Sequence, residues 1–151
     1  MWLLYKNGIL TPNSEGFLEG WLNLRMINKI YKKALGTLKE RILKNLGDRV
    51  MSIVVYGSVA REDSTRDSDI DVLIVGRDKD MWGRISEIAY DVDYENDFET
   101  FIIPFYLTKE DLQHRVKAGS PFIFEVLREG VLLYDDGTFQ RIREKVLRTR
   151  G

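Results

Sequence analysis

Apolar residues recur at two different spacings along this chain, and the spacings predict helices and strands in alternation. Over residues 21–46 the apolar positions follow a helical period and lysines occupy the opposite face, which predicts one long amphipathic helix that ends at Gly47. Two short β-branched runs, at residues 50–56 and 70–75, are each followed by a glycine. Runs of this length and composition predict two buried strands.

The second half of the chain continues the alternation. Pro104 lies inside an apolar run and predicts that this strand is at an edge or a bulge, because proline cannot donate to a sheet ladder. Thr108 begins a capping box, and Ser120 followed by Pro121 is typical of the start of a helix. The elements predicted here are a helix over 81–95, a strand over 101–107, helices from 108 to about 118 and from 120 to Gly130, a strand over 131–134 and a helix over 138–149.

This order of elements predicts one α/β or α+β domain over residues 21–151, with residues 1–20 as a loop or hairpin before it. No apolar run reaches the roughly 20 residues of a membrane span, and the absence of cysteine excludes disulfides and thiolate chemistry. The net charge of -1 gives no general attraction to nucleic acid or lipid, so RNA binding by the basic helices is disfavoured. No signal peptide is recognised, which makes the cytoplasm the expected location. An exposed sheet edge would allow pairing with a second copy or a partner.

Two aspartates at the start of the second strand are the first candidate for chemistry. Asp69 and Asp71 are separated by one residue. Alternate residues of a strand project to the same face, so both carboxylates are expected to converge. A hard divalent cation such as Mg²⁺ relieves the repulsion between two such carboxylates. An Asp-x-Asp pair alone is more often a solvated strand cap, as a lone Gly-Ser pair is more often a common turn, and only their combination favours a site.

The end of the first strand is the second candidate. Gly57 and Ser58 follow it directly, and a short helix is predicted at residues 59–61. Free backbone amides and a hydroxyl at such a turn can hold a phosphate. Together with a metal held by Asp69 and Asp71, the loop would bind a nucleoside triphosphate, which suits phosphoryl or nucleotidyl transfer.

The spacing Gly57-Ser58, ten residues, Asp69-x-Asp71 resembles the minimal nucleotidyltransferase (MNT) family of the DNA polymerase β-like superfamily. The resemblance implies a mixed sheet flanked by helices and Mg²⁺-dependent transfer of a nucleoside monophosphate, most simply AMP from ATP, to a hydroxyl acceptor. It also implies that Gly57 and Ser58 bind the triphosphate and that Asp69 and Asp71 bind the metal. Arg61 and Arg66, in the same loop, would neutralise phosphate charge, although exposed loop arginines are usually only solvated.

The resemblance also implies a third carboxylate on the following strand. Here that strand is apolar at its centre, and Glu99 at its start, or less well Asp97, is the candidate general base or third ligand. The alternative is a solvated acid in an acidic stretch, and the consequence would be a weak enzyme or a nucleotide-binding and partner-docking module. The acidic stretch comprises Asp91, Asp93, Glu95, Asp97 and Glu99.

Family members of this size are frequently antitoxins of a HEPN-domain ribonuclease toxin, which they modify by AMP transfer to a tyrosine. The resemblance therefore implies a protein acceptor. Members that modify aminoglycosides carry an additional substrate domain, for which this chain leaves little room. His114 is the only histidine and is predicted to be a surface residue rather than a ligand or base.

Overall fold

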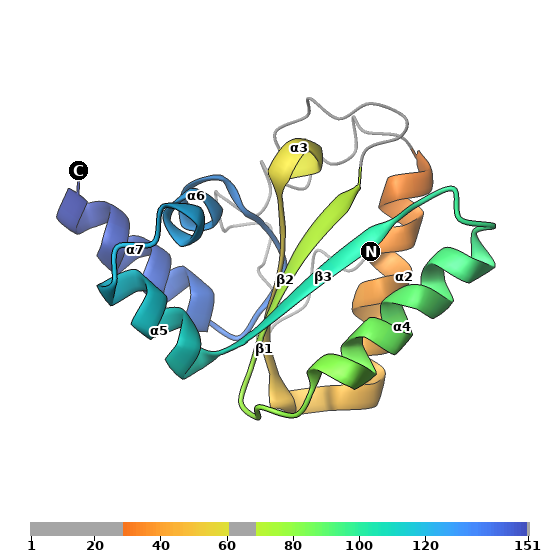
Figure 1. Ribbon diagram of the computed structural model, residues 1–151, viewed down its shortest axis with the longest axis horizontal. Helices are drawn as coiled ribbons and strands as arrows, with labels where there is room; N and C mark the ends of the chain where they lie inside the picture. Colours follow the sequence, from red (N-terminus) through yellow and green to blue (C-terminus); the bar gives the residue numbers. More distant parts are fainter. Residues whose placement is uncertain (1–28, 61–68, 151) are drawn as a thin grey trace.

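The structure is a computed structural model that describes residues 29–60 and 69–150. One mixed sheet lies between two layers of helices (Figure 1). The described elements are α2 (Lys29–Leu46), the 3-10 helix η2 (Gly47–Arg49), β1 (Val50–Tyr56), α3 (Gly57–Ala60), β2 (Ile70–Gly76), α4 (Trp82–Glu95), β3 (Ile102–Thr108), α5 (Lys109–Lys117), α6 (Pro121–Glu129), β4 (Val131–Asp135) and α7 (Thr138–Arg150).

The four strands are arranged in the order β3-β2-β1-β4. Strand β1 is antiparallel to both of its neighbours, whereas β2 and β3 are parallel. Helix α4 makes the crossover between the two parallel strands, which such a pair requires. The sheet therefore confirms the α+β class expected from the sequence.

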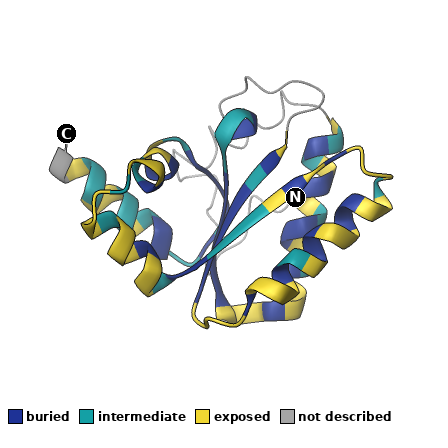
Figure 2. Cartoon of the chain, viewed as in Figure 1, coloured by how far each residue is buried: buried dark blue, intermediate teal, exposed yellow. Residues whose placement is uncertain are grey.

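Each face of the sheet is covered by its own helices. Helices α2 and α4 lie against one face, and α5, α6 and α7 against the other (Figure 1). Because successive strand residues alternate between faces, Ile53 and Val55 of β1 pack towards α2 and α4, while Val54 packs towards α6 and α7. Strands β1, β2 and β4 are consequently almost wholly buried, whereas the edge strand β3 is partly exposed. Most other exposed residues are on the outer faces of the helices (Figure 2).

The predicted helix starts and the predicted edge strand are confirmed. The Thr108 hydroxyl accepts a hydrogen bond from the Asp111 amide at 3.0 Å, and the Ser120 hydroxyl accepts one from the Ile123 amide at 3.3 Å. Pro104 lies on β3, which is an edge strand. The predicted extension at residues 1–20 and the first part of the predicted 21–46 helix lie outside the described residues. No helix in the described ranges has the length and apolar character needed to cross a membrane.

A buried carboxylate joins the sheet to the last helix. Asp135, at the end of β4, accepts hydrogen bonds from the Ser52 hydroxyl at 2.7 Å and from the backbone amides of Phe139 and Gln140 at 3.1 and 3.0 Å. Burial raises the pKa of Asp135, and these hydrogen bonds oppose that effect. The side chain thus caps the start of α7 and ties it to β1.

We expect Asp135→Ala to lower the free energy of unfolding by about 2 to 4 kcal/mol, because it leaves several buried donors without an acceptor. Urea denaturation followed by circular dichroism measures the change. Ser52→Ala is the matched control, since it removes one donor and leaves the two amides capped, and it should cost about 1 kcal/mol. Equal losses in the two variants would show that the helix cap contributes nothing.

Candidate functional site

The two sequence motifs meet at one end of the sheet. Tyr56, the last residue of β1, pairs with Asp71 of β2, so the loop that begins at Gly57 leaves the sheet beside the aspartates. Helix α3 begins at Gly57 without an intervening loop. The antiparallel pairing therefore places Gly57 and Ser58 next to the start of β2.

Gly57 is in direct van der Waals proximity to the Asp71 carboxylate. A Cβ atom at position 57 would lie 2.5 Å from Oδ2 of Asp71 and 3.4 Å from its Cγ. The backbone at Gly57 also has φ of +76°, in the left-handed region that L side chains rarely adopt. Both observations favour glycine at this position, and the close approach places the start of the loop against the carboxylate.

The aspartates lie at the end of the sheet where β1 finishes, and Asp71 is on the face opposite α2 and α4. Ile70 and Val72 point into the core beneath α2 and α4, so the alternation directs Asp71 to the opposite face. Asp71 is half-buried, and Asp69, immediately before the strand, is exposed. Two carboxylates two residues apart provide oxygen ligands of the type that Mg²⁺ prefers. The donor set therefore fits a divalent cation with two protein ligands.

The strand beside them offers no carboxylate at the matching position. Ile103 of β3 is the register partner of Asp71, so its side chain lies on the same face, 45% exposed. Glu99 lies in the exposed turn before β3. Within residues 29–60 and 69–150, no three acidic or histidine side chains gather as a metal-binding group. The role of Glu99 as general base or third ligand remains a prediction.

We expect Ile103→Asp to raise the affinity for Mn²⁺ by about tenfold, because it adds a carboxylate beside Asp71. Isothermal titration calorimetry with Mn²⁺ measures the change. Ile103→Asn has nearly the same shape without the charge and is the matched control. Equal affinities for the two variants would show that position 103 does not face the cation.

A small cavity also borders Gly57. It encloses about 180 Å³ between the end of β1 and α6. The ring of Tyr56 contacts that of Phe122 edge-on at 5.5 Å. Burial, and to a smaller extent the charge of Asp71, raises the pKa of Tyr56 to about 12, so its hydroxyl stays protonated and can donate. The lining consists of Tyr56, Gly57, Phe122, Glu125, Val126 and Glu129.

Sequence reasoning missed this cavity. Glu125 and Glu129 are four residues apart and share one face of α6, a spacing visible in the sequence. Both carboxylates interact with Arg128, at 2.9 and 3.3 Å. Nothing in the sequence indicated that α6 packs beside Gly57, because that proximity comes from the tertiary arrangement.

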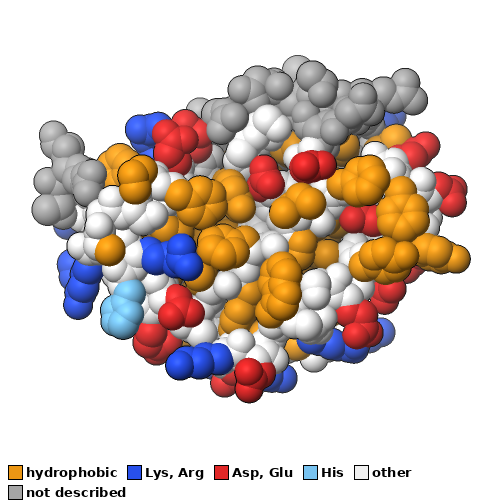
Figure 3. Space-filling view, viewed as in Figure 1, with side chains coloured by type: hydrophobic (Ala, Val, Ile, Leu, Met, Phe, Trp, Pro, Cys, Tyr) orange, Lys and Arg blue, Asp and Glu red, His pale blue; other side chains and the backbone are white. Residues whose placement is uncertain are grey.

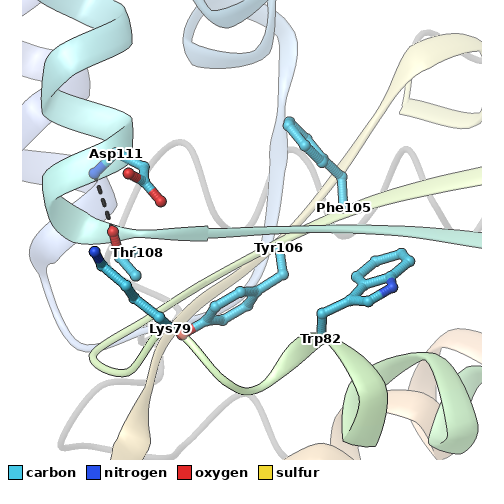
Figure 4. Close-up of a pocket in the computed structure, with 6 residues that line it drawn as sticks. All are labelled: Lys79, Trp82, Phe105, Tyr106, Thr108 and Asp111. Carbon is cyan, nitrogen blue, oxygen red and sulfur yellow. Dashed lines mark hydrogen bonds between the residues drawn. The ribbon is translucent and has the colours of Figure 1, made fainter.

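A larger cavity, of about 540 Å³, lies at the opposite end of the sheet (Figure 4). Thr108 lines it and pairs with Gly76, five register positions from the Asp71–Ile103 pair. This cavity is therefore separate from the aspartates. Its lining consists of Lys79, Trp82, Phe105, Tyr106, Thr108 and Asp111.

Of the other residues considered in the sequence, two are described by the structure and two are not. Ser58 is described and half-buried in the first turn after β1. Arg61 and Arg66 lie outside the described residues. His114 is exposed on α5, which confirms its predicted surface position.

Comparison with known proteins identifies the family. Residues 37–138 match the family model of the polymerase beta nucleotidyltransferase domain. The chain belongs to this family. The match spans both motifs and every strand of the sheet, so the resemblance inferred from Gly57, Ser58, Asp69 and Asp71 is confirmed at the level of the superfamily.

One similar chain occurs in a crystal structure of a toxin-antitoxin with AMP-PNP. It shares 16% sequence identity with this chain at a TM-score of 0.47, and the alignment covers 75% of this chain and 86% of that one. Similarity at this level does not transfer the ligand or partner of that protein. None of the curated proteins matches the sequence at a significant level.

Proposed function

We propose that this protein is a Mg²⁺-dependent nucleotidyltransferase that transfers AMP from ATP to a hydroxyl acceptor. The observation that supports this most strongly is the contact between Gly57 and the Asp71 carboxylate, inside a domain that matches the nucleotidyltransferase family. A phosphate-binding turn and a metal-binding carboxylate must adjoin if one triphosphate is to contact both.

The proposed roles follow from these positions. Asp69 and Asp71 would hold the cation, which when bound neutralises charge on the phosphates. Gly57 and Ser58 would orient the β- and γ-phosphates through backbone amides and the hydroxyl, with Arg61 and Arg66 as further cationic contacts. The acceptor oxygen forms a bond to the α-phosphorus while the bond from that phosphorus to the β-bridging oxygen breaks, and pyrophosphate leaves. Glu99 is the proposed acceptor of the hydroxyl proton.

The proposed acceptor is a hydroxyl of a partner protein, such as a HEPN-domain toxin, with this chain as the antitoxin. The sequence resemblance to the MNT family supports this assignment. We test it by incubating candidate partners with ATP and Mg²⁺ and measuring their intact masses. A gain of about 329 Da, one AMP, that requires Asp69 and Asp71 is the expected result. Unmodified partner, in the presence of demonstrated binding, would contradict transfer.

A second candidate function is supported by the apolar neighbour of Asp71. Ile103 occupies the strand position where a third carboxylate would face the aspartates, which favours a nucleotide-binding or partner-docking module without transfer activity. The two functions differ in one observable. A module would bind ATP in a manner dependent on Gly57 yet release no pyrophosphate in the presence of any acceptor.

A further inference from the structure

Four exposed aromatic rings form a continuous patch at the end of α4 and in its connection to β3. Ring centroids of Tyr90 and Tyr94 lie 6.4 Å apart, Phe98 lies 5.6 and 6.1 Å from these two, and Phe101 lies 6.2 Å from Phe98. The residues are 58%, 64%, 39% and 53% exposed in sequence order. A contiguous group of exposed rings is typical of an interaction surface rather than of chance exposure. We call these four residues the aromatic patch.

Carboxylates surround the aromatic patch, and cations are absent from its stretch of sequence. Residues 85–108 contain no lysine, arginine or histidine, although the whole chain has a net charge of only -1. The acids Asp91, Asp97 and Glu99 are exposed and adjacent in sequence to patch residues. In the space-filling view, acidic side chains border the hydrophobic group over this end of α4 (Figure 3).

Three other acids of residues 85–108 are already engaged, the first being Glu87, which pairs with Arg84 at 3.0 Å. Glu95 forms a two-point ion pair with Arg41 of α2, with Nη2 to Oε1 at 2.7 Å. Asp93 is buried and accepts hydrogen bonds from the Thr100 hydroxyl at 2.6 Å and the Ile102 amide at 2.9 Å. The negative charge available to a ligand is therefore that of Asp97 and Glu99 in the connection, next to the rings, together with that of Asp91 on α4, which also acts on Arg41.

Rings bordered by carboxylates select a guanidinium or ammonium group. Cations lie favourably over aromatic faces, and arginine does so while also donating to carboxylates. This chain contains the same chemistry elsewhere, since Arg115 lies 5.5 Å from the centroid of Phe105 and Arg143 lies 5.0 Å from that of Phe139. Among the described residues, the rings of the aromatic patch contact one another and no cation is stacked on them.

The same charge distribution argues against other occupants. A nucleic acid or an anionic membrane would bring phosphates against Asp91, Asp97 and Glu99. A symmetric contact with a second copy would bring the same carboxylates together, because a two-fold interface apposes identical surfaces. A positively charged protein segment meets neither penalty.

The neighbouring sheet edge favours contact through side chains rather than strand addition. On β3, the Ile102 amide donates to the Asp93 carboxylate, and Pro104 has no amide hydrogen. These two positions of the edge strand therefore cannot donate to an added strand, which protects the edge from pairing. The aromatic patch, beside this edge, remains available to the side chains of a partner.

We propose that the aromatic patch and its carboxylates bind an arginine- or lysine-bearing segment of another protein. The docked segment lies beside the start of β2, because the Ile70 amide donates to the Phe101 carbonyl at 2.8 Å. The inference rests on exposure and charge and holds whether or not the protein transfers a nucleotide.

Nuclear magnetic resonance titration of the full chain tests this inference. The probe is a short blocked peptide in which arginine and leucine alternate, and the control peptide carries citrulline, a neutral isostere, in place of arginine. We expect amide shifts concentrated at residues 90–101 and at least about tenfold tighter binding of the arginine peptide. Shifts centred elsewhere, or equal binding of the two peptides, would overturn the proposal.

Two variants separate specific docking from general attraction to an acidic surface. Tyr94→Ala, at the most exposed ring, should weaken the arginine peptide about fivefold, and Asp97→Asn with Glu99→Gln should weaken it more strongly. The matched control is Glu110→Gln with Glu144→Gln, which removes equal charge from exposed positions on α5 and α7. Equal losses in both charge variants would overturn the proposal. Self-association that Tyr94→Ala disrupts, measured by sedimentation, would assign the surface to a second copy instead.

Discussion

Replacement of Asp71 by asparagine is expected to reduce nucleotidyl transfer by more than about a thousandfold. The substitution keeps the shape of the side chain beside Gly57 and removes the charge that would hold the cation, and a metal contributes several kcal/mol to stabilisation of such a transition state. Asp69→Asn should act in the same direction. Release of pyrophosphate from ATP, in the presence of an acceptor, measures the effect.

The matched control for this prediction is Asp80→Asn. Asp80 is exposed in the connection before α4, so the control makes the same chemical change away from the two motifs. It should leave transfer unchanged within about twofold. If Asp71→Asn retained full activity while remaining folded, the cation would have to bind elsewhere and the proposed roles of both aspartates would be wrong.

Gly57→Ala is expected to lower both the stability of the fold and the affinity for nucleotide. An alanine at φ of +76° costs about 1 to 2 kcal/mol, and its Cβ at 2.5 Å from the Asp71 carboxylate forces the turn or the carboxylate to move. We therefore expect at least about 2 kcal/mol lower free energy of unfolding, together with loss of ATP binding. Urea denaturation and calorimetry measure the two effects.

Gly36→Ala is the matched control for Gly57→Ala, and we expect it to stabilise the protein. Gly36 is exposed inside α2, with nothing within 4 Å of an added Cβ, so alanine should stabilise the protein by about 0.5 to 1 kcal/mol. ATP binding should not change in this variant. If Gly57→Ala bound ATP as tightly as Gly36→Ala, the turn after β1 would not be the phosphate-binding element.

Most of the fold follows from local signals in the sequence. The strands at Val50–Tyr56 and Ile70–Gly76 are buried on both faces, and such strands appear as continuous apolar runs. The starts of α5 and α6 depend on the capping residues Thr108 and Ser120, whose hydrogen bonds involve residues three positions away. Interactions of this range can be inferred without knowledge of the tertiary structure.

Features that depend on long-range packing could not be inferred in this way. The acidic stretch suggested solvated carboxylates, yet Asp93 is only 5% exposed and holds the α4–β3 connection through two hydrogen bonds. The pairing of Ile103 with Asp71 depends on the register of two parallel strands joined by a helix. Neither the register nor the residue of β3 that faces the aspartates can be inferred from the sequence pattern.

The candidate site was likewise predictable only where local sequence signals determine it. The motif spacing predicted that Gly57 and the aspartates act on one ligand, whereas the antiparallel pairing of β1 with β2 that brings them together was seen only in the structure. The cavity beside Tyr56 and the exposed rings from Tyr90 to Phe101 were not predictable. Helical spacing places aromatic residues on a face of a helix but does not determine whether another element covers that face.

The position of the phosphorus atom that is transferred tests the central claim most directly. ATP labelled at the α-phosphate and ATP labelled at the γ-phosphate are incubated separately with the protein, Mg²⁺ and a candidate protein acceptor that binds it. Nucleotidyl transfer predicts that the α-label enters the acceptor, that the γ-label leaves as pyrophosphate, and that Asp69→Asn with Asp71→Asn abolishes both. Entry of the γ-label into the acceptor, or retention of the α-label in ATP by a complex that binds both ATP and acceptor, would contradict the account.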